Sequence, residues 1–341
     1  MYDIEAILSS LAEHAPTWLL YIVIALCLAV LSKSADKMID GAVALAQRTR
    51  LPKIFIGATI ISLGTTVPET VVSVVAAWSG HSGLALGNGV GSIICDTALI
   101  FGLMCVLAKI PVRKSILNRT GWIQVGAATL LVIVSLLALW RAPSDPVLGR
   151  GVGVLLLSLL FLYMYLSYLW ARQGVQVGYE EEGETCSTLK STVLVLVGLT
   201  GVIAASRVLI PCAVVGAYRI GVPQDVVAAT IVAFGTSVPE LATGISSVKK
   251  GYPQIMVGNV VGADVLNCLF VIGASAFTQP LTVPDNFYYL HFPAMLAILY
   301  FFRFCIFVNS DGWFKRWQGM CLLGLYALYL TLQYGLNIGG V

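Results

Sequence analysis

Two short strings in this chain combine an acid, two hydroxyls, a glycine and a proline inside otherwise apolar segments. They are Gly64-Thr65-Thr66-Val67-Pro68-Glu69 and Gly235-Thr236-Ser237-Val238-Pro239-Glu240. Glu240 follows Glu69 by 171 residues, and the same offset holds without a gap from position 58 to position 102. Ionisable groups at bilayer depth cost about 2.5–3.5 kcal/mol or more, so chains keep them there mainly for a function. The doubled string therefore indicates an internal repeat that carries a site.

Each proline in these strings removes one backbone hydrogen bond. Pro68 leaves the carbonyl of Gly64 without its helical donor, and Pro239 does the same to Gly235. We expect each motif to break its helix at mid-membrane and to free carbonyl oxygens. Loose backbone at that depth is tolerated only where it faces protein, water or an ion.

The hydroxyls of both motifs share a helical face with the glutamate, because they precede it by four and three residues. They are Thr65 and Thr66 before Glu69, and Thr236 and Ser237 before Glu240. Further along, polar residues spaced by four form a second line in each copy: Asn88, Ser92 and Asp96, matched by Asn259, Ala263 and Asn267. Oxygen ligands of this kind suit Na⁺, Ca²⁺ or Mg²⁺ and do not suit zinc or copper.

The composition is that of an integral membrane protein with little soluble mass. Hydrophobic residues make up 58% and charged residues 11% of the chain, against roughly 25% charged in soluble domains. The net charge of +3 is small, and nucleic-acid binding has no support. The eight cysteines lack the spacing of a disulfide or zinc framework. The N-terminus shows no pattern of a removable signal peptide.

Apolar runs of about 20 residues predict an all-α fold with ten transmembrane helices. Their expected ranges are 17–32 with an extension toward 46, 54–78, 84–108, 120–140, 148–170, 191–216, 224–248, 253–277, 287–308 and 317–336. The second motif lies five helices after the first, and because five is an odd number the second copy should cross the membrane in the opposite direction. We expect two inverted-topology repeats of five helices, 1–171 and 191–341, joined by a loop at 172–190. Secondary transporters often have this architecture, with the binding site at the midplane.

Lysine and arginine predict the orientation. Most of them lie in one set of loops, which we assign to the cytoplasm together with loop 172–190. Both termini are then outside the cell membrane.

At the two motifs, and at the downstream Gly-Asn-x-Val-Gly segments, the chain resembles the sodium/calcium exchangers of the cation/calcium exchanger superfamily. The resemblance covers about 54–103 and 225–274 and implies an antiporter that exchanges Na⁺ for Ca²⁺. It implies Glu69 and Glu240 as the central Ca²⁺ ligands. The further ligands that it implies are the oxygens of Thr65, Thr66, Thr236 and Ser237, carbonyls of Ser62 and Ala233, Ser92 for Na⁺, and Asp96 and Asn267 at the flanks.

The chain departs from the family pattern at four positions. Asp96 and Asn267 look exchanged relative to related proteins, Ala263 stands where a serine is usual, and Asp264 is an additional carboxylate. H⁺-coupled exchange through Asp96 or Asp264, and K⁺-dependent exchange, therefore stay open. A channel would gather one filter around an axis of subunits, which two unlike half-sites in one chain do not favour. We expect no enzymatic activity, no cofactor and no obligatory protein partner; the partners are Ca²⁺, Na⁺ and the lipid bilayer.

Overall fold

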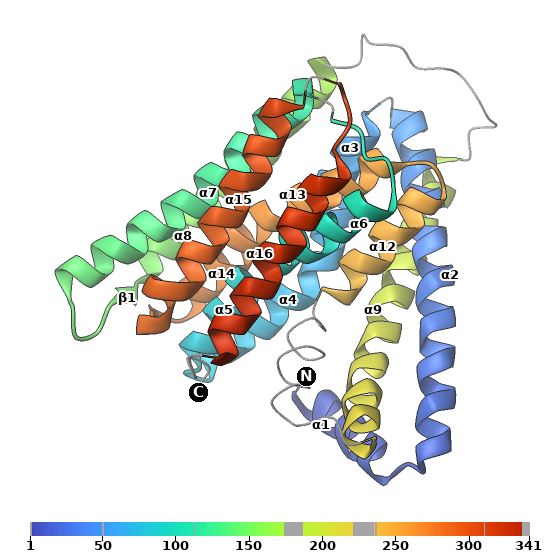
Figure 1. Ribbon diagram of the computed structural model, residues 1–341, viewed down its shortest axis with the longest axis horizontal. Coiled ribbons are helices and arrows are strands. Elements are labelled where there is room, and N and C mark those ends of the chain that lie inside the picture. The colour runs from blue at the N-terminus through green and yellow to red at the C-terminus, as the bar shows by residue number, and fades with distance from the viewer. Residues whose placement is uncertain are drawn as a thin grey trace.

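The computed structural model describes residues 2–49, 51–112, 114–173, 187–220, 235, 237–309 and 311–335. Two long helices, α2 (Thr17–Thr49) and α9 (Thr188–Arg219), lie side by side along one flank (Figure 1). Glycines allow them to approach closely, because a Cβ on Gly198 would lie 2.6 Å from the backbone nitrogen of Met38. Gly41 faces Ser191 in the same way, so the two helices run antiparallel.

The spans that carry the motifs occupy the centre. In the first copy they are α3 (Lys53–Ile56), η1 (Gly57–Ile61) and α4 (Ser62–Trp78), followed by α5 (Ser82–Ile94), η2 (Cys95–Phe101) and α6 (Gly102–Leu107). In the second they are α12 (Val238–Lys249), α13 (Pro253–Leu266), η5 (Asn267–Val271) and α14 (Ile272–Thr278). Within the span Pro253–Thr278, 94% of the apolar window is buried, against 22% in Thr17–Thr49. The motif spans are therefore packed among other helices.

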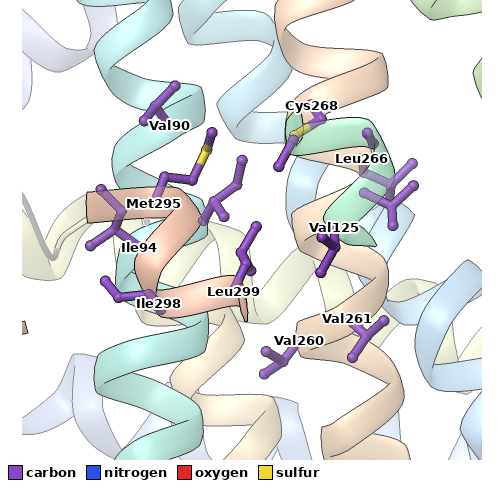
Figure 2. Close-up of a cluster of buried hydrophobic side chains, with 14 of the residues drawn as sticks. Val90, Ile94, Val125, Val260, Val261, Leu266, Cys268, Met295, Ile298 and Leu299 are labelled. Carbon is purple, nitrogen blue, oxygen red and sulfur yellow. The ribbon is translucent and has the colours of Figure 1, made fainter. Parts of the chain in front are cut away.

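The outer helices cover this centre on the side away from α2. They are α7 (Lys114–Arg141), α8 (Arg150–Gln173), η6 (Phe287–His291), α15 (Phe292–Val308) and α16 (Arg316–Gly335). Figure 2 shows Val90 and Ile94 of α5 facing Met295 and Leu299 of α15, with Val125, Val260 and Leu266 nearby. This contiguous apolar core fixes the distance between the inner and the outer helices.

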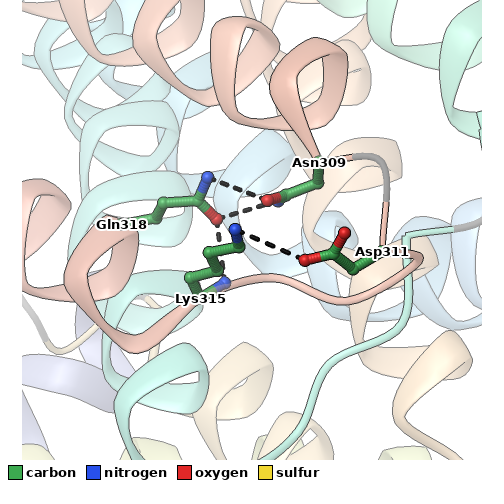
Figure 3. A network of polar contacts seen from close by, with 4 residues as sticks. All are labelled: Asn309, Asp311, Lys315 and Gln318. Atoms are coloured by element: carbon green, nitrogen blue, oxygen red, sulfur yellow. Dashed lines mark hydrogen bonds and ion pairs between the residues drawn. The ribbon is translucent and has the colours of Figure 1, made fainter.

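A polar network joins α15 to α16. The side-chain amides of Asn309 and Gln318 exchange hydrogen bonds of 2.8 and 3.2 Å, and both residues are buried (Figure 3). The oxygen of Gln318 also accepts a 2.9 Å hydrogen bond from the backbone of Lys315. A 3.4 Å ion pair between Lys315 and Asp311 lies at the surface of the same turn.

Two helices of the second copy begin 171 residues after their counterparts in the first copy, the same offset that separates the two motifs. The helices α2 and α9 begin at Thr17 and Thr188, and α5 and α13 begin at Ser82 and Pro253. Each copy also contains a π-helical segment at the same place, η2 in the first and η5 in the second. The internal repeat predicted from the motifs therefore extends to the backbone.

Within the described residues, eight helices are long and apolar enough to cross a membrane. The multi-pass all-α membrane fold is thereby confirmed, while ten spans stay a prediction. The first half of the expected helix 224–248 lies outside the described residues, and α16 matches the expected range 317–336. Two elements were not expected: helix α1 (Tyr2–His14), and an antiparallel pair of strands, β1 (Val147–Leu148) and β2 (Leu281–Thr282).

Candidate cation-binding site

The two motif glutamates come together in the protein interior. Glu69 on α4 and Glu240 on α12 are each 2% exposed, and their carboxylates lie close enough to interact electrostatically. Asp96 in η2 lies within electrostatic reach of both glutamates. One acid from each copy thus lies within electrostatic reach of the other, and a third carboxylate from the first copy lies near both.

The backbone at the motifs differs from the expectation. Helix α4 runs without interruption from Ser62 to Trp78, so the predicted break at Pro68 is wrong for the first copy. The missing N–H of Pro68 removes one hydrogen bond, and the flanking turns hold the helix together. In the second copy, α12 begins at Val238 with Pro239 in its first turn, where a proline needs no donor partner. Residues 221–234 and Thr236 lie outside the described residues.

Several buried side-chain oxygens have no hydrogen-bond partner within the part of the chain that the structure describes. Those belonging to predicted site residues are Thr66 Oγ1, Glu69 Oε2, Ser92 Oγ, Asp96 Oδ1, Ser237 Oγ, Glu240 Oε2 and Asn267 Oδ1. A buried polar atom left without a partner costs about 1–3 kcal/mol. Such atoms are frequent in this core, which fits a site that exchanges hydration oxygens of a cation for protein oxygens.

The hydroxyls do not all behave alike. Thr65 donates to the carbonyls of Ile61 and Ser62 at 3.2 and 3.3 Å, and it also lies beside the carboxylate of Glu240. Ser237 lies beside the carboxylate of Asp96 without meeting hydrogen-bond geometry. Of the three motif hydroxyls among the described residues, those of Thr66 and Ser237 are available to a ligand, whereas that of Thr65 is shared with its own helix.

Two asparagines hold the glutamate helices to their neighbours. Asn88 donates to the backbone carbonyl of Glu69 at 3.2 Å and to the hydroxyl of Ser73 at 2.9 Å. Asn259 donates at 3.2 Å to Thr243, which itself donates to the carbonyl of Glu240 at 3.1 Å. Each asparagine fixes the helix turn that carries the acid, so it positions the acid.

The structure places three of the remaining predicted site residues and leaves two outside the described part of the chain. Ser62 is buried, and its carbonyl accepts from Thr65. Ser92 on α5 and Asn267 in η5 are buried, but no described contact joins either side chain to the glutamates. The calls on Ala233 and Thr236 fall outside the described residues.

Sequence reasoning missed two partners of Asp264. Its Oδ2 accepts hydrogen bonds from the hydroxyl of Thr97 and, at 2.5 Å, from the amide of Gln124. Gln124 is the one amide side chain in the apolar run 120–140, and that isolation was an available signal.

The donor set is one of mixed oxygens. Among the described residues, no group of three or more His, Cys, Asp or Glu side chains is arranged as a metal cluster. A cation between Glu69 and Glu240 would be held by two carboxylates, with hydroxyl, amide and carbonyl oxygens completing its shell. That arrangement suits a weakly held, exchangeable Ca²⁺ or Na⁺ better than a resident transition metal.

Comparisons with known proteins agree with this chemistry. A family model described as sodium/calcium exchanger protein matches residues 19–169 and 190–335. The inner membrane protein YrbG of Escherichia coli is 30% identical over 89% of this chain and 93% of its own length. The sodium/calcium exchanger MaX1 of Methanosarcina acetivorans is 25% identical over 92% of this chain and 98% of its own. Solved structures of the sodium-calcium exchanger NCX_Mj have the same fold, with a TM-score of 0.77 at 23% identity over 93% of this chain and 99% of theirs.

Proposed function

The chain belongs to the sodium/calcium exchanger family, as its motifs predicted, and from this premise we propose that it exchanges Na⁺ for Ca²⁺ across the cell membrane. The family is one of transporters rather than enzymes. The ions bind at mid-membrane between the two repeats, and access to the site alternates between the two sides.

One observation carries this proposal: the burial of Glu69 and Glu240 next to each other, one from each copy. Their two negative charges balance one Ca²⁺, which takes about 6–8 oxygens at 2.3–2.6 Å. The unpartnered hydroxyls of Thr66 and Ser237 are suited to supply further oxygens. We assign the same role to the carbonyls of Ser62 and Ala233 and to Thr65 and Thr236.

Exchange follows from competition for these acids. Na⁺ ions held by Ser92, Asp96, Asn267 and the glutamates would crowd a Ca²⁺ bound between the same carboxylates. Binding of one kind of ion therefore expels the other. A site that is filled by either substrate, but not by both, couples the two fluxes.

Alternating access requires two states of similar energy, and an inverted repeat supplies them. The antiparallel packing of α2 against α9, which hold equivalent places in the two copies, supports this symmetry. We propose halves at 1–171 and 191–341 that exchange roles between inward-facing and outward-facing states. The loop 172–190 is cytoplasmic and both termini are outside.

Two related couplings deserve a direct test because Asp96 lies among the glutamates. A carboxylate at this place is suited to take up a proton or to hold K⁺ in addition to Na⁺. Exchange coupled to H⁺, or dependent on K⁺, is therefore the second candidate. It differs from the first in the driving gradient and not in the Ca²⁺ site.

The test is ⁴⁵Ca²⁺ uptake into proteoliposomes loaded with Na⁺, measured against a pH gradient alone and with or without K⁺. We expect uptake that follows the Na⁺ gradient. Glu69→Gln keeps the volume of the side chain but removes its charge, so uptake should fall at least about tenfold while the protein stays folded. Asp145→Asn, at an exposed turn, removes a charge far from the site and should transport normally. Normal uptake by Glu69→Gln would reject the assigned site.

A further inference from the structure

A fourth buried carboxylate lies within electrostatic reach of Asp96 and was not assigned to the site described above. Asp264 on α13 is 1% exposed. Its Oδ2 accepts hydrogen bonds from Thr97 of η2 and from Gln124 of α7, both of them buried. Three elements, one of them an outer helix, thus converge on one acid.

Two oxygens of this group are left over. Asp264 Oδ1 and Gln124 Oε1 have no hydrogen-bond partner in the described part of the chain, although both residues are 99% buried. The ion pairs among the described residues do not include Asp264. A buried carboxylate without a counter-charge is strongly disfavoured, and hydrogen bonds at one of its two oxygens compensate it only in part. The cluster therefore lacks one positive charge.

The packing of the fold does not require polar residues at this place. The repeat offset of 171 residues relates Asp264, Thr97 and Gln124 to Ile93, Cys268 and Met295. All three counterparts are buried in the apolar core, and Figure 2 shows Cys268 and Met295 among its side chains. The fold thus fills the equivalent volume with apolar groups in one half and with an acid, an amide and a hydroxyl in the other. That asymmetry points to a ligand.

We propose that Asp264, Gln124 and Thr97 form a second cation site that takes one monovalent alkali cation near Asp96. The proposal rests on the proposed function for the identity of the transported ions. Carboxylate, amide and hydroxyl oxygens are hard donors that suit an alkali cation. Asp264 is the one charged side chain of the three, and its single charge matches one monovalent ion.

The second site is coupled to the first through Asp96. The carboxylates of Asp96 and Asp264 lie close enough to repel each other. A cation at Asp264 reduces that repulsion, so the occupancy of the two sites is interdependent. Na⁺ or K⁺ can be the occupant, and separate titrations distinguish them.

Thermal unfolding of the purified full-length protein, without Ca²⁺, measures this site independently of transport. A ligand that binds the folded state raises the melting temperature with the logarithm of its concentration, in proportion to the number of ions bound. The melting temperature is measured at increasing NaCl or KCl, with choline chloride as the reference salt. We expect its rise with the logarithm of the salt concentration to be smaller in Asp264→Asn than in the wild type, by the share of one bound ion. The Hill coefficient for Na⁺ in Ca²⁺ transport should fall by about one.

Two further variants keep the test decisive if Asp264→Asn folds poorly. Gln124→Met introduces the residue type found at the equivalent position, Met295, which is of nearly equal size. It removes the amide oxygen and should lower the affinity for the same ion at least threefold. Met295→Leu changes the packing at the equivalent place in the other half and should leave every ion dependence unchanged.

The outcomes separate this proposal from the proposed function. Glu69→Gln should lose stabilisation by Ca²⁺ while Asp264→Asn retains it. If Glu69→Gln keeps that stabilisation, the proposed function fails. If Asp264→Asn and Gln124→Met match the wild type in both NaCl and KCl, the second site is refuted and the cluster is structural only.

Discussion

Replacing Gly262 by alanine tests the close packing that positions both halves of the site. Gly262 lies on α13 between Asn259 and Asp264, and it faces the backbone of Ala58 in η1. A Cβ built at this position would lie 2.6 Å from Cα and 2.7 Å from the carbonyl carbon of Ala58. Carbon atoms pack at about 3.5–4.0 Å. The two helices must therefore separate by about 1 Å.

The magnitude follows from that displacement. Forcing an extra carbon into a well-packed interior costs about 1–3 kcal/mol. Because the obstacle is backbone rather than a flexible side chain, we expect the upper half of this range. The η1 segment leads directly into α4 and Glu69, so the misplacement also reaches the site. A shift of about 1 Å in the positions of ligands is enough to lower transport by about 10- to 100-fold.

The assay combines unfolding with flux. Six of the seven cysteines among the described residues are buried, so a thiol-reactive fluorophore reports thermal unfolding in detergent. We expect Gly262→Ala to melt several degrees below the wild type and to show reduced ⁴⁵Ca²⁺ uptake in proteoliposomes. Gly126→Ala is the matched control, because a Cβ on this α7 residue meets no described atom within 4 Å. An unchanged melting temperature and normal uptake for Gly262→Ala would refute the reasoning.

Two further predictions concern contacts away from the site. Gln318→Leu removes both hydrogen bonds to Asn309 and one to the backbone of Lys315, so buried groups lose their partners. It should lower the free energy of unfolding by about 1–3 kcal/mol, seen as a lower melting temperature than that of the control Gln279→Leu at an exposed position. Lys250→Met breaks the 2.6 Å ion pair with Asp40, whose side chain is 55% exposed. An exposed ion pair contributes about 0–1 kcal/mol to stability, so ⁴⁵Ca²⁺ uptake should not change. A large loss of uptake would mean that this pair has a role in transport.

The convergence of the two glutamates could be predicted because the information is local and doubled. A motif with an acid at the same place in both copies, in helices of opposite direction, predicts that the acids meet. The helix ranges followed from apolar length, and the expected range 287–308 matches η6 and α15. The family could be recognised from the same strings.

Other features depend on tertiary contacts that the sequence does not encode locally. The partners of Asp264 come from positions 97 and 124, and nothing near Asp264 points to them. The continuity of α4 through Pro68 is not visible in the motif, where a proline predicts a break, because the flanking turns hold the helix together despite one missing hydrogen bond. Strands β1 and β2 have two residues each, which is too short for the alternation of apolar and polar residues that predicts a strand.

The π-helical segments bear on how the backbone is shaped where the polar side chains stand. A π-helical turn spaces its hydrogen bonds by five residues rather than four, and it frequently lies at a functional site. Here the segments Cys95–Phe101 and Asn267–Val271 hold equivalent places in the two copies, although their sequences, CDTALIF and NCLFV, have little in common. The wider turn therefore does not depend on one particular sequence. It holds an acid, Asp96, in one copy and an amide, Asn267, in the other, so the two copies offer the same backbone with a different charge.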